Sequence, residues 1–451
     1  MNATVAKNAF YLSAASVAQK LLSFVYFTYI SNLLGAGEQG KYSFALAFTT
    51  IFSIVADLGL TPVMIREISR ARERTREILH TVLGVKIILV LCAYALAVFF
   101  AIGLKHYSPE EIILIVAAGA VMMFDSVHLT VYGVFRAHQN LKVEAVGVVI
   151  GQTLTLGFGA VALFLHWPLV TLIAALAGGS LFNVLWSTWS LWHWQKISLF
   201  GVGRMAILPT IVKEAVPFAL AGIFTRVYSG LDSVLLRTLN DSRAVGLYSV
   251  PYKIAFAFQF IPMAVSAALY PAMSECFARD KTRLAHLFER ATFTLSLIVF
   301  PVAVGISVLA KEILAFAFLP EYGVAASALI FLMAALIFSF LDFPVGSLLN
   351  ACNRQHAQTL AMGATMVVNL IANLFFIPRW GITGAAAAAC DTMAIASCGL
   401  AQTWRRYGSD GRCGFIGEAL YACSGCRPDW RADLWRDDSC SAGSFLAEVG
   451  C

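Results

Sequence analysis

Residues 10–33, FYLSAASVAQKLLSFVYFTYISNL, decide the fold of this chain together with residues 215–238, AVPFALAGIFTRVYSGLDSVLLRT. Each stretch supplies the about 20 apolar residues that a helix needs to cross a hydrocarbon layer of about 30 Å. Each also holds one cation well inside it, Lys20 in the first and Arg226 in the second. Because a charge at mid-bilayer costs roughly 3 kcal/mol on insertion scales, both residues are candidates for function.

The rest of the chain continues this pattern. Hydrophobic residues make up 59% of the 451 residues, charged residues only 13%, and the mean hydropathy is +0.76. These values exclude an ordinary soluble domain, and continuous apolar runs indicate helices rather than a barrel. We predict an all-α polytopic membrane protein with about twelve spans, at residues 10–33, 43–65, 82–104, 112–135, 144–166, 169–192, 215–238, 247–272, 291–310, 324–349, 358–378 and 382–404. The first span is expected to be a retained helix, not a signal peptide.

The connections between spans differ in charge. Those after even-numbered spans are basic, at residues 66–76, 136–142, 196–213 and 279–290, whereas the others carry few cations. This asymmetry predicts that both termini face the cytoplasm. The net charge of +6 then reflects topology and contact with anionic membrane lipids, and nucleic acid is not an expected partner.

The two halves of the chain repeat each other. A shift of about 206 positions places Lys20 on Arg226, and one of 217 places Asp125 on Asp342. The first shift also matches Ser23, Gly40, Tyr42 and Ser43 with Ser229, Gly246, Tyr248 and Ser249. Since each half keeps an even number of spans, the halves are parallel repeats, and such transporters place cargo between them.

We therefore divide the chain into an N-terminal six-helix lobe at 1–192, a cytoplasmic linker at 193–214 and a C-terminal six-helix lobe at 215–406. Residues 407–451 form a polar tail with five of the ten cysteines. Cys423 and Cys426 have the spacing of a metal knuckle, but no second close Cys or His pair accompanies them. We expect the tail to be disordered or non-homologous, and we predict neither a metal site nor a cofactor.

Several short motifs resemble the polysaccharide-transporter family of the multidrug/oligosaccharidyl-lipid/polysaccharide exporter superfamily, over about residues 5–405. They are LG at 34–35, GKYS at 40–43, DLGL at 57–60, REI at 66–68, Asp232, GLYS at 246–249, Lys253 with Ile254, Asn369, Asn373 and WGITGAA at 380–386. The resemblance implies two six-helix lobes in a V, alternately open to each face of the bacterial inner membrane. The implied cargo is an undecaprenyl-diphosphate-linked oligosaccharide, such as an O-antigen or exopolysaccharide unit, with glycan polymerase and chain-length proteins as candidate partners.

Lys20 and Arg226 are the predicted substrate-binding residues. A lipid diphosphate must cross a layer of low dielectric, and two cations facing each other across an inter-lobe cavity would offset its loss of hydration. Arg226 can hold phosphate oxygens bidentately, and Lys20 acts as a point charge. The alternative is internal pairing of Arg226 with Asp232 and of Lys20 with Asp57.

The carboxylates inside predicted spans are candidates for ion coupling or gating. They are Asp57, Asp125, Asp232, Asp342 and Asp391, and His128 shares a helix face with Asp125. Buried carboxylates can exchange protons or bind sodium, which would couple transport to an ion gradient. The alternative is that they hold helices together through hydrogen bonds.

The functions that remain open are related but distinct. A flippase for a lipid-linked oligosaccharide needs an anion-binding cavity, whereas a cation-coupled multidrug exporter of the same superfamily needs carboxylates and aromatics. A peptidoglycan-precursor flippase is similar, but the relatives that we would compare carry two further helices. A membrane-embedded glycan polymerase or ligase usually needs a large external loop with catalytic groups, and the odd connections here are short. We therefore expect a transporter that is not an enzyme.

Overall fold

The structure is a computed structural model and describes residues 3–103, 107–199, 201, 203–352 and 355–407. Its first half contains α1 (Ala3–Asp57), α2 (Leu60–Arg70), α3 (Thr75–Gly103), α4 (Pro109–Ala137), α5 (Leu141–Phe164) and α6 (Val170–Gln195). Its second half contains α7 (Leu208–Leu239), α8 (Ser242–Ala257), α9 (Phe260–Arg279), α10 (Lys281–Val308), α11 (Ala310–Ala317), α12 (Ala326–Ala351) and α13 (Gln355–Tyr407). Three 3₁₀ segments, η1 (Arg72–Arg74), η2 (Met205–Ile207) and η3 (Pro320–Ala325), lie in connections.

The predicted all-α membrane fold is confirmed. Nine helices of the described residues are long and apolar enough to cross a membrane. The predicted number of spans is larger for two reasons. The first two predicted spans lie in α1 and α2, which form a bent pair outside these nine, and α13 counts once although it holds the last two predicted spans. The chain passes from one span to the next at Gly35 (φ 72°) and Gly381 (φ 54°), within what is formally one helix. Glycine adopts this left-handed backbone at no steric cost, so it permits each reversal.

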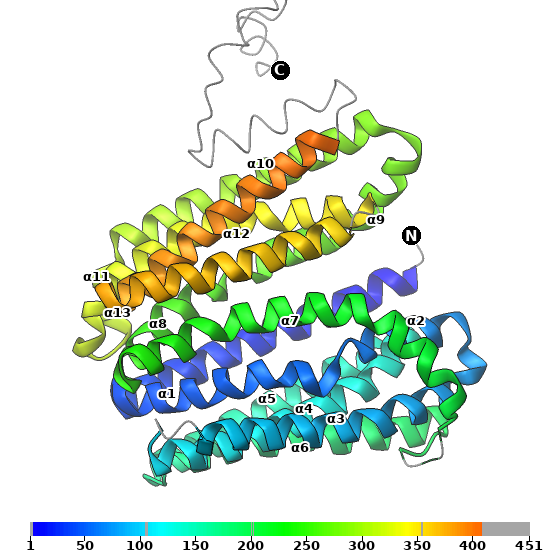
Figure 1. Cartoon of the computed structure of the whole chain (residues 1–451), viewed down its shortest axis with the longest axis horizontal. Coiled ribbons are helices and arrows are strands. Elements are labelled where there is room, and N and C mark those ends of the chain that lie inside the picture. The colour runs from blue at the N-terminus through cyan, green and yellow to red at the C-terminus, as the bar shows by residue number, and fades with distance from the viewer. Residues whose placement is uncertain (1–2, 104–106, 200, 202, 353–354, 408–451) are drawn as a thin grey trace, which may run out of the picture.

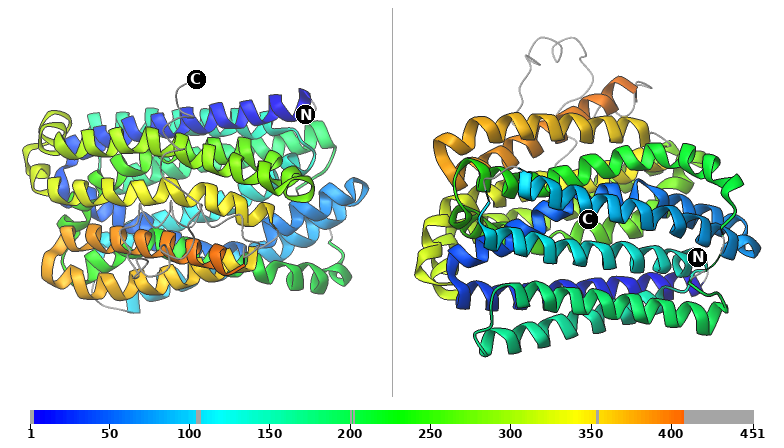
Figure 2. Two further views of the ribbon diagram at one scale, coloured as in Figure 1. Left: turned by 90° about the horizontal axis from the view of Figure 1, so that it is seen from above. Right: turned by 60° about the horizontal axis from the view of Figure 1, so that its bottom comes forward.

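The helices form two lobes (Figure 1). Helices α1 to α6 make the lower group, α9 to α13 make the upper group, and α7 and α8 lie between them. The long helices run side by side in the further views of Figure 2. The lobes diverge toward the end where the N-terminus lies, which gives the expected V. We call that end, with the arginine-rich connection after α2, the basic end, and the other the opposite end.

The apolar cores follow the same division. At the opposite end one core joins both lobes, with Phe44 and Leu114 from the first lobe and Tyr248 and Tyr322 from the second, all buried. Toward the basic end the cores are separate. One packs α2, α3 and α4 with the start of α7, and another packs α9, α10 and α12. The lobes are therefore held together at the opposite end by apolar burial.

Two glycines bring the lobes into backbone contact at the opposite end. A Cβ on Gly40 would lie 1.7 Å from the carbonyl oxygen of Ser242, and a Cβ on Gly246 would lie 1.8 Å from that of Ala36. The internal repeat relates the two contacts, because it places Gly40 on Gly246 and Ala36 on Ser242. The pseudo-two-fold axis therefore passes through this glycine contact.

The connection between the lobes packs on α3. His80 Nε2 lies 2.8 Å from the carbonyl oxygen of Ser198, and the amide of Arg204 donates to Thr81 Oγ1 at 2.9 Å. Helix α7 already begins at Leu208, inside the predicted linker. The exact division into lobes stays a prediction, and residues 408–451 of the predicted tail lie outside the described residues.

Substitution of Gly40 by Ala is expected to destabilise the closed opposite end, because the new methyl group meets backbone atoms that cannot rotate away. Overpacking of this kind costs about 1–3 kcal/mol. Thermal unfolding of the purified protein would measure the effect as a lower Tm. Gly37→Ala is the matched control, since a Cβ there meets nothing within 4 Å. Equal Tm values for the two variants would contradict this interpretation.

Candidate functional site

A polar stripe runs along α1 at the depth of its cation. Ser16, Gln19, Lys20 and Ser23 follow the spacing of three and four residues that places side chains on one helix face. Gln19 is exposed, and the other three are half-buried. A membrane-spanning helix that exposes such a stripe needs water on that side.

The other side of α1 has the opposite character. Leu21, Val25, Tyr29 and Leu33 recur every four residues and are all exposed. At 100° per residue, this row is centred on the face of α1 away from Lys20. Exposed apolar side chains on a membrane helix suit contact with lipid, so the ammonium group of Lys20 does not share the lipid-facing side.

Helix α7 repeats the polar stripe. Gly222, Thr225, Arg226 and Ser229 occupy the positions that match the stripe of α1 in the repeat. Thr225, Arg226 and Ser229 are exposed. Both predicted substrate-binding residues therefore lie on polar faces of equivalent helices, and this arrangement fits a shared aqueous space between the lobes.

Lys253 on α8 is a third cation, and sequence reasoning did not single it out as a site residue. Its ammonium group donates to Ser23 Oγ at 3.0 Å and lies 5.5 Å from the ring centroid of Phe27. It is also near enough to Lys20 for the two charges to interact unfavourably. Its repeat equivalent is Ala47, so a search for matched charges could not find it. Its place in the family-like motif after residues 246–249 was the available signal.

Lys20, Arg226 and Lys253 have no carboxylate partner within 4 Å among the described residues. The alternative pairings of Lys20 with Asp57 and of Arg226 with Asp232 are therefore wrong. Asp57 instead accepts from Lys86 Nζ at 2.5 Å, and Lys86 also donates to Thr61 at 2.7 Å. Lys86 is almost fully buried. This pair joins α1 to α3 within one lobe, and sequence spacing could not reveal it because the partners lie on separate helices.

Asp232 lies in a buried polar cluster of the C-terminal lobe. The hydroxyl group of Tyr248 donates to Asp232 Oδ2 and the amide nitrogen of Asn373 donates to Oδ1, both at 2.9 Å. Asn369 and Thr392 complete the cluster, and both are fully buried. Its oxygen atoms come from α7, α8 and the two halves of α13.

The hydrogen bonds of this cluster do not balance. The amide nitrogen of Asn373 has two hydrogens but lies within bonding distance of three oxygens, one on Asp232 and two on Asn369. The side-chain oxygen of Asn373 is buried without a partner. Among the described residues no group of three or more His, Cys, Asp or Glu could hold a metal. The excess of oxygen acceptors instead fits a monovalent cation or a proton.

Asp125 and Asp342 make equivalent contacts in the two lobes. Ser180 donates to Asp125 at 2.6 Å, and Ser397 donates to Asp342 at 2.8 Å, with the serine 55 residues after the aspartate in each case. The structure also brings His128 to Asp125, with Nε2 at 3.1 Å from Oδ1.

The sixth candidate for ion coupling or gating, Asp391, lies on an exposed position of α13. Among the described residues its side chain has no hydrogen bond or ion pair. The next residue, Thr392, belongs to the buried cluster around Asp232, but the side chain of Asp391 is exposed and does not take part in it.

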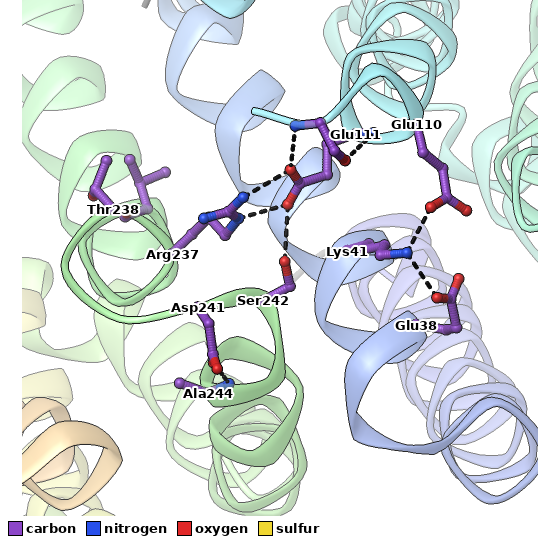
Figure 3. Close-up of polar contacts among 11 residues, drawn as sticks. Glu38, Lys41, Glu110, Glu111, Arg237, Thr238, Asp241, Ser242 and Ala244 are labelled. Carbon is purple, nitrogen blue, oxygen red and sulfur yellow. Dashed lines mark hydrogen bonds and ion pairs between the residues drawn. The ribbon is translucent and has the colours of Figure 1, made fainter. Parts of the chain in front are cut away.

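Ion pairs close the opposite end of the inter-lobe space (Figure 3). Arg237 of α7 donates to both carboxylate oxygens of Glu111 of α4, at 2.5 and 2.8 Å, and Ser242 donates to the same carboxylate at 2.8 Å. The side chain of Glu111 is only 1% exposed. Because Glu111 also accepts from the amide of Ser108 at the start of α4, its position is fixed.

Further contacts across the lobes surround this pair. Glu321 accepts from the amide of Ala36 at 2.7 Å, and Asn32 donates to the carbonyl oxygen of Ala317 at 2.8 Å. The opposite end is therefore closed by several polar contacts in addition to the joint apolar core.

At the basic end, one ion pair joins Arg66 of α2 to Glu214 of α7.

Fold and site together define a two-lobed, multi-pass membrane transporter. The family described as "Polysaccharide biosynthesis protein" matches residues 5–277, and the MatE family matches residues 217–376. The chain belongs to the polysaccharide biosynthesis protein family.

Individual proteins are similar to this chain in sequence or in fold. A protein of Haloferax volcanii named "Probable low-salt glycan biosynthesis flippase Agl15" is 23% identical over 392 residues, which cover 87% of this chain and 81% of that protein. An inward-facing multidrug resistance MATE transporter has a similar fold, with a TM-score of 0.69, 15% identity and coverage of 91% of this chain and 99% of that one. The lipid II flippase MurJ, in an inward closed conformation, also gives a TM-score of 0.69, with 14% identity and coverage of 92% and 97%.

Replacement of Arg237 by Ala is expected to open the opposite end, because it leaves the buried carboxylate of Glu111 without its cation. Loss of one partner from a buried pair costs about 3–5 kcal/mol. One spin label on α5 and one on α10, both placed at the opposite end of the molecule, would report a longer distance between the lobes.

Arg243→Ala is the matched control. Its pair with Glu321 is 3.0 Å long, and the side chain of Arg243 is 60% exposed, so its loss should cost no more than about 1 kcal/mol. An Arg237→Ala protein with the distance distribution of this control would argue against a gating role for the buried pair.

Proposed function

We propose that this protein is a flippase that moves an undecaprenyl-diphosphate-linked oligosaccharide between the leaflets of a bacterial inner membrane. The observation that carries the proposal is the set of three cations, Lys20 on α1, Arg226 on α7 and Lys253 on α8, which have no carboxylate partner within 4 Å in the described part of the chain. The positive-inside pattern of the sequence predicts that the basic end and both termini face the cytoplasm. Cargo is then loaded from the cytoplasmic leaflet.

A diphosphate is the ligand class that suits these cations. At 4 Å and an effective dielectric of 20, each cation–phosphate contact contributes about 4 kcal/mol of Coulomb energy, which offsets the loss of hydration. The guanidinium group of Arg226 can hold two phosphate oxygens, while Lys20 and Lys253 supply point charges. Sugars then remain in the aqueous space, and the polyprenyl chain stays in lipid.

The positions of the contacts favour an alternating-access cycle. The opposite end is closed by the glycine contact, the joint core and the Glu111–Arg237 pair, whereas the cores separate toward the basic end. This is a state that receives cargo from the cytoplasm. Transfer requires the closed end to separate while the basic end closes, with no covalent chemistry.

A cation-coupled multidrug exporter is the second candidate, because the MatE family matches part of the chain. Its cationic cargo would be repelled by three unpaired cations, so the charge of the site favours the flippase. A glycan polymerase or ligase is less consistent with the short connections at the opposite end, such as residues 240–241 between α7 and α8. We therefore propose glycan polymerase and chain-length proteins as partners of this protein, not polymerisation as its own activity.

We assign ion coupling to the Asp232 cluster ahead of the other carboxylates. Its unbalanced oxygens can take up sodium or a proton. Asp57 is already neutralised by Lys86, and the side chain of Asp391 is exposed. Asp125 and Asp342, with their serine partners, are the second choice.

Lys20→Ala and Arg226→Ala are each expected to lower translocation of lipid-linked oligosaccharide by about tenfold or more, since 1.4 kcal/mol of lost binding is a factor of ten. Leaflet translocation in proteoliposomes measures the effect at equal protein insertion. Lys213→Ala, an exposed cation on the same helix as Arg226, is the control and should transport normally. Normal transport by both site variants would remove the diphosphate proposal.

Asp232→Asn keeps the shape of the side chain and removes its charge. If Asp232 holds the coupling ion, this variant should translocate cargo with little response to an imposed sodium or proton gradient. The comparison is the rate with and without each gradient in the same vesicles. A gradient response equal to that of the unmodified protein would transfer the coupling role to another residue.

A further inference from the structure

The C-terminal lobe contains a cavity of about 370 Å³ between α7, α12 and α13. This lies within the roughly 300–1,000 Å³ range of small-molecule sites. Thr225, Asp342, Asn350 and Gln358 contribute polar groups to its wall. The proposed diphosphate site does not include this space.

The cavity adjoins the cation stripe. Thr225 belongs to the exposed polar stripe of α7 and also lines the cavity, and the next residue in the chain is Arg226. A ligand that places its anionic group at Arg226 therefore has its neighbouring groups within reach of the cavity mouth. In a lipid-linked oligosaccharide the group next to the diphosphate is the first sugar.

We propose that this cavity binds the sugar nearest the diphosphate, an inference that rests on the proposed function. Carboxamides and carboxylates exchange hydrogen bonds with sugar hydroxyl groups, and the wall offers both in Asn350, Gln358 and Asp342. Tyr228 and Phe343 add aromatic rings against which the apolar face of a sugar ring can pack. The combination suits a neutral, hydroxyl-rich ligand.

The polar groups of the wall leave room for such a ligand. Ser397 donates to Oδ1 of Asp342, so Oδ2 can accept from a sugar hydroxyl. A Cβ on Gly346 would lie only 2.9 Å from the side-chain nitrogen (Nε2) of Gln358. The glycine therefore leaves space for this carboxamide in the wall of the cavity. A polyprenyl chain in this cavity would cover amides and a carboxylate without hydrogen-bonding them, which is unfavourable.

The test compares two kinds of lipid on the full-length protein in nanodiscs. The first is undecaprenyl diphosphate, and the second is the same lipid bearing N-acetylglucosamine, galactose or glucose. The unmodified protein should bind at least one sugar-bearing lipid more tightly than the bare diphosphate. Asn350→Ala and Gln358→Ala should each weaken that binding by about tenfold and leave bare diphosphate unchanged.

Gln355→Ala is the matched control, because Gln355 lies on the same helix and is exposed outside the cavity. A second variant fills the space instead of removing a polar group. Gly346→Leu should abolish the preference for sugar-bearing lipid, whereas Gly305→Leu should keep it, since a Cβ on Gly305 meets nothing within 4 Å.

The outcomes separate this inference from the function on which it rests. Lys20→Ala and Arg226→Ala should each weaken the binding of both lipids equally, and unchanged binding of both lipids by both variants would overturn the flippase proposal. Equal binding of bare and sugar-bearing lipids by the unmodified protein would overturn the sugar site alone. So would a sugar preference that survives in Asn350→Ala, Gln358→Ala and Gly346→Leu.

Discussion

The cost of a charge inside a membrane governs this structure. Each charged group within the helices must be paired, hydrated or able to bind a counter-charge. Asp57 is paired with Lys86 within one lobe, and Glu111 is paired with Arg237 across the lobes. Among the described residues, Lys20, Arg226 and Lys253 have no carboxylate partner within 4 Å. Their lack of a carboxylate partner, on polar helix faces, is the observation that favours the proposed anion site over a set of structural contacts.

The all-α fold, the spans and the internal repeat could all be predicted from the sequence, because apolar length and matched residues carry that information directly. The equivalence of Lys20 and Arg226 was also predicted from the internal repeat. The partner of Asp57 could not be predicted, since Lys86 approaches it only when α3 packs on α1. Lys253 was missed for another reason, because its match in the repeat is the uncharged Ala47. Contacts between helices, unlike spans, have no local signature.

The closed end combines two kinds of interaction with different consequences. The glycine contact and the joint apolar core depend on close fit, and both are lost together if the lobes separate there. The Glu111–Arg237 pair can exchange its partner for water once the end opens, so its release costs less than its burial suggests. A transporter needs this balance, because a conformation that is too stable would trap its cargo.

The internal repeat matches the charged Lys253 with the uncharged Ala47, and this difference affects the orientation in which a headgroup could bind. Two identical halves would offer a diphosphate two equivalent poses, turned by half a rotation, with its two ends exchanged. A positive charge on α8 with no counterpart on the other side removes that degeneracy. Under the proposed function, the headgroup would then be held one way round, and its long hydrocarbon chain would leave through only one of the two seams between the lobes.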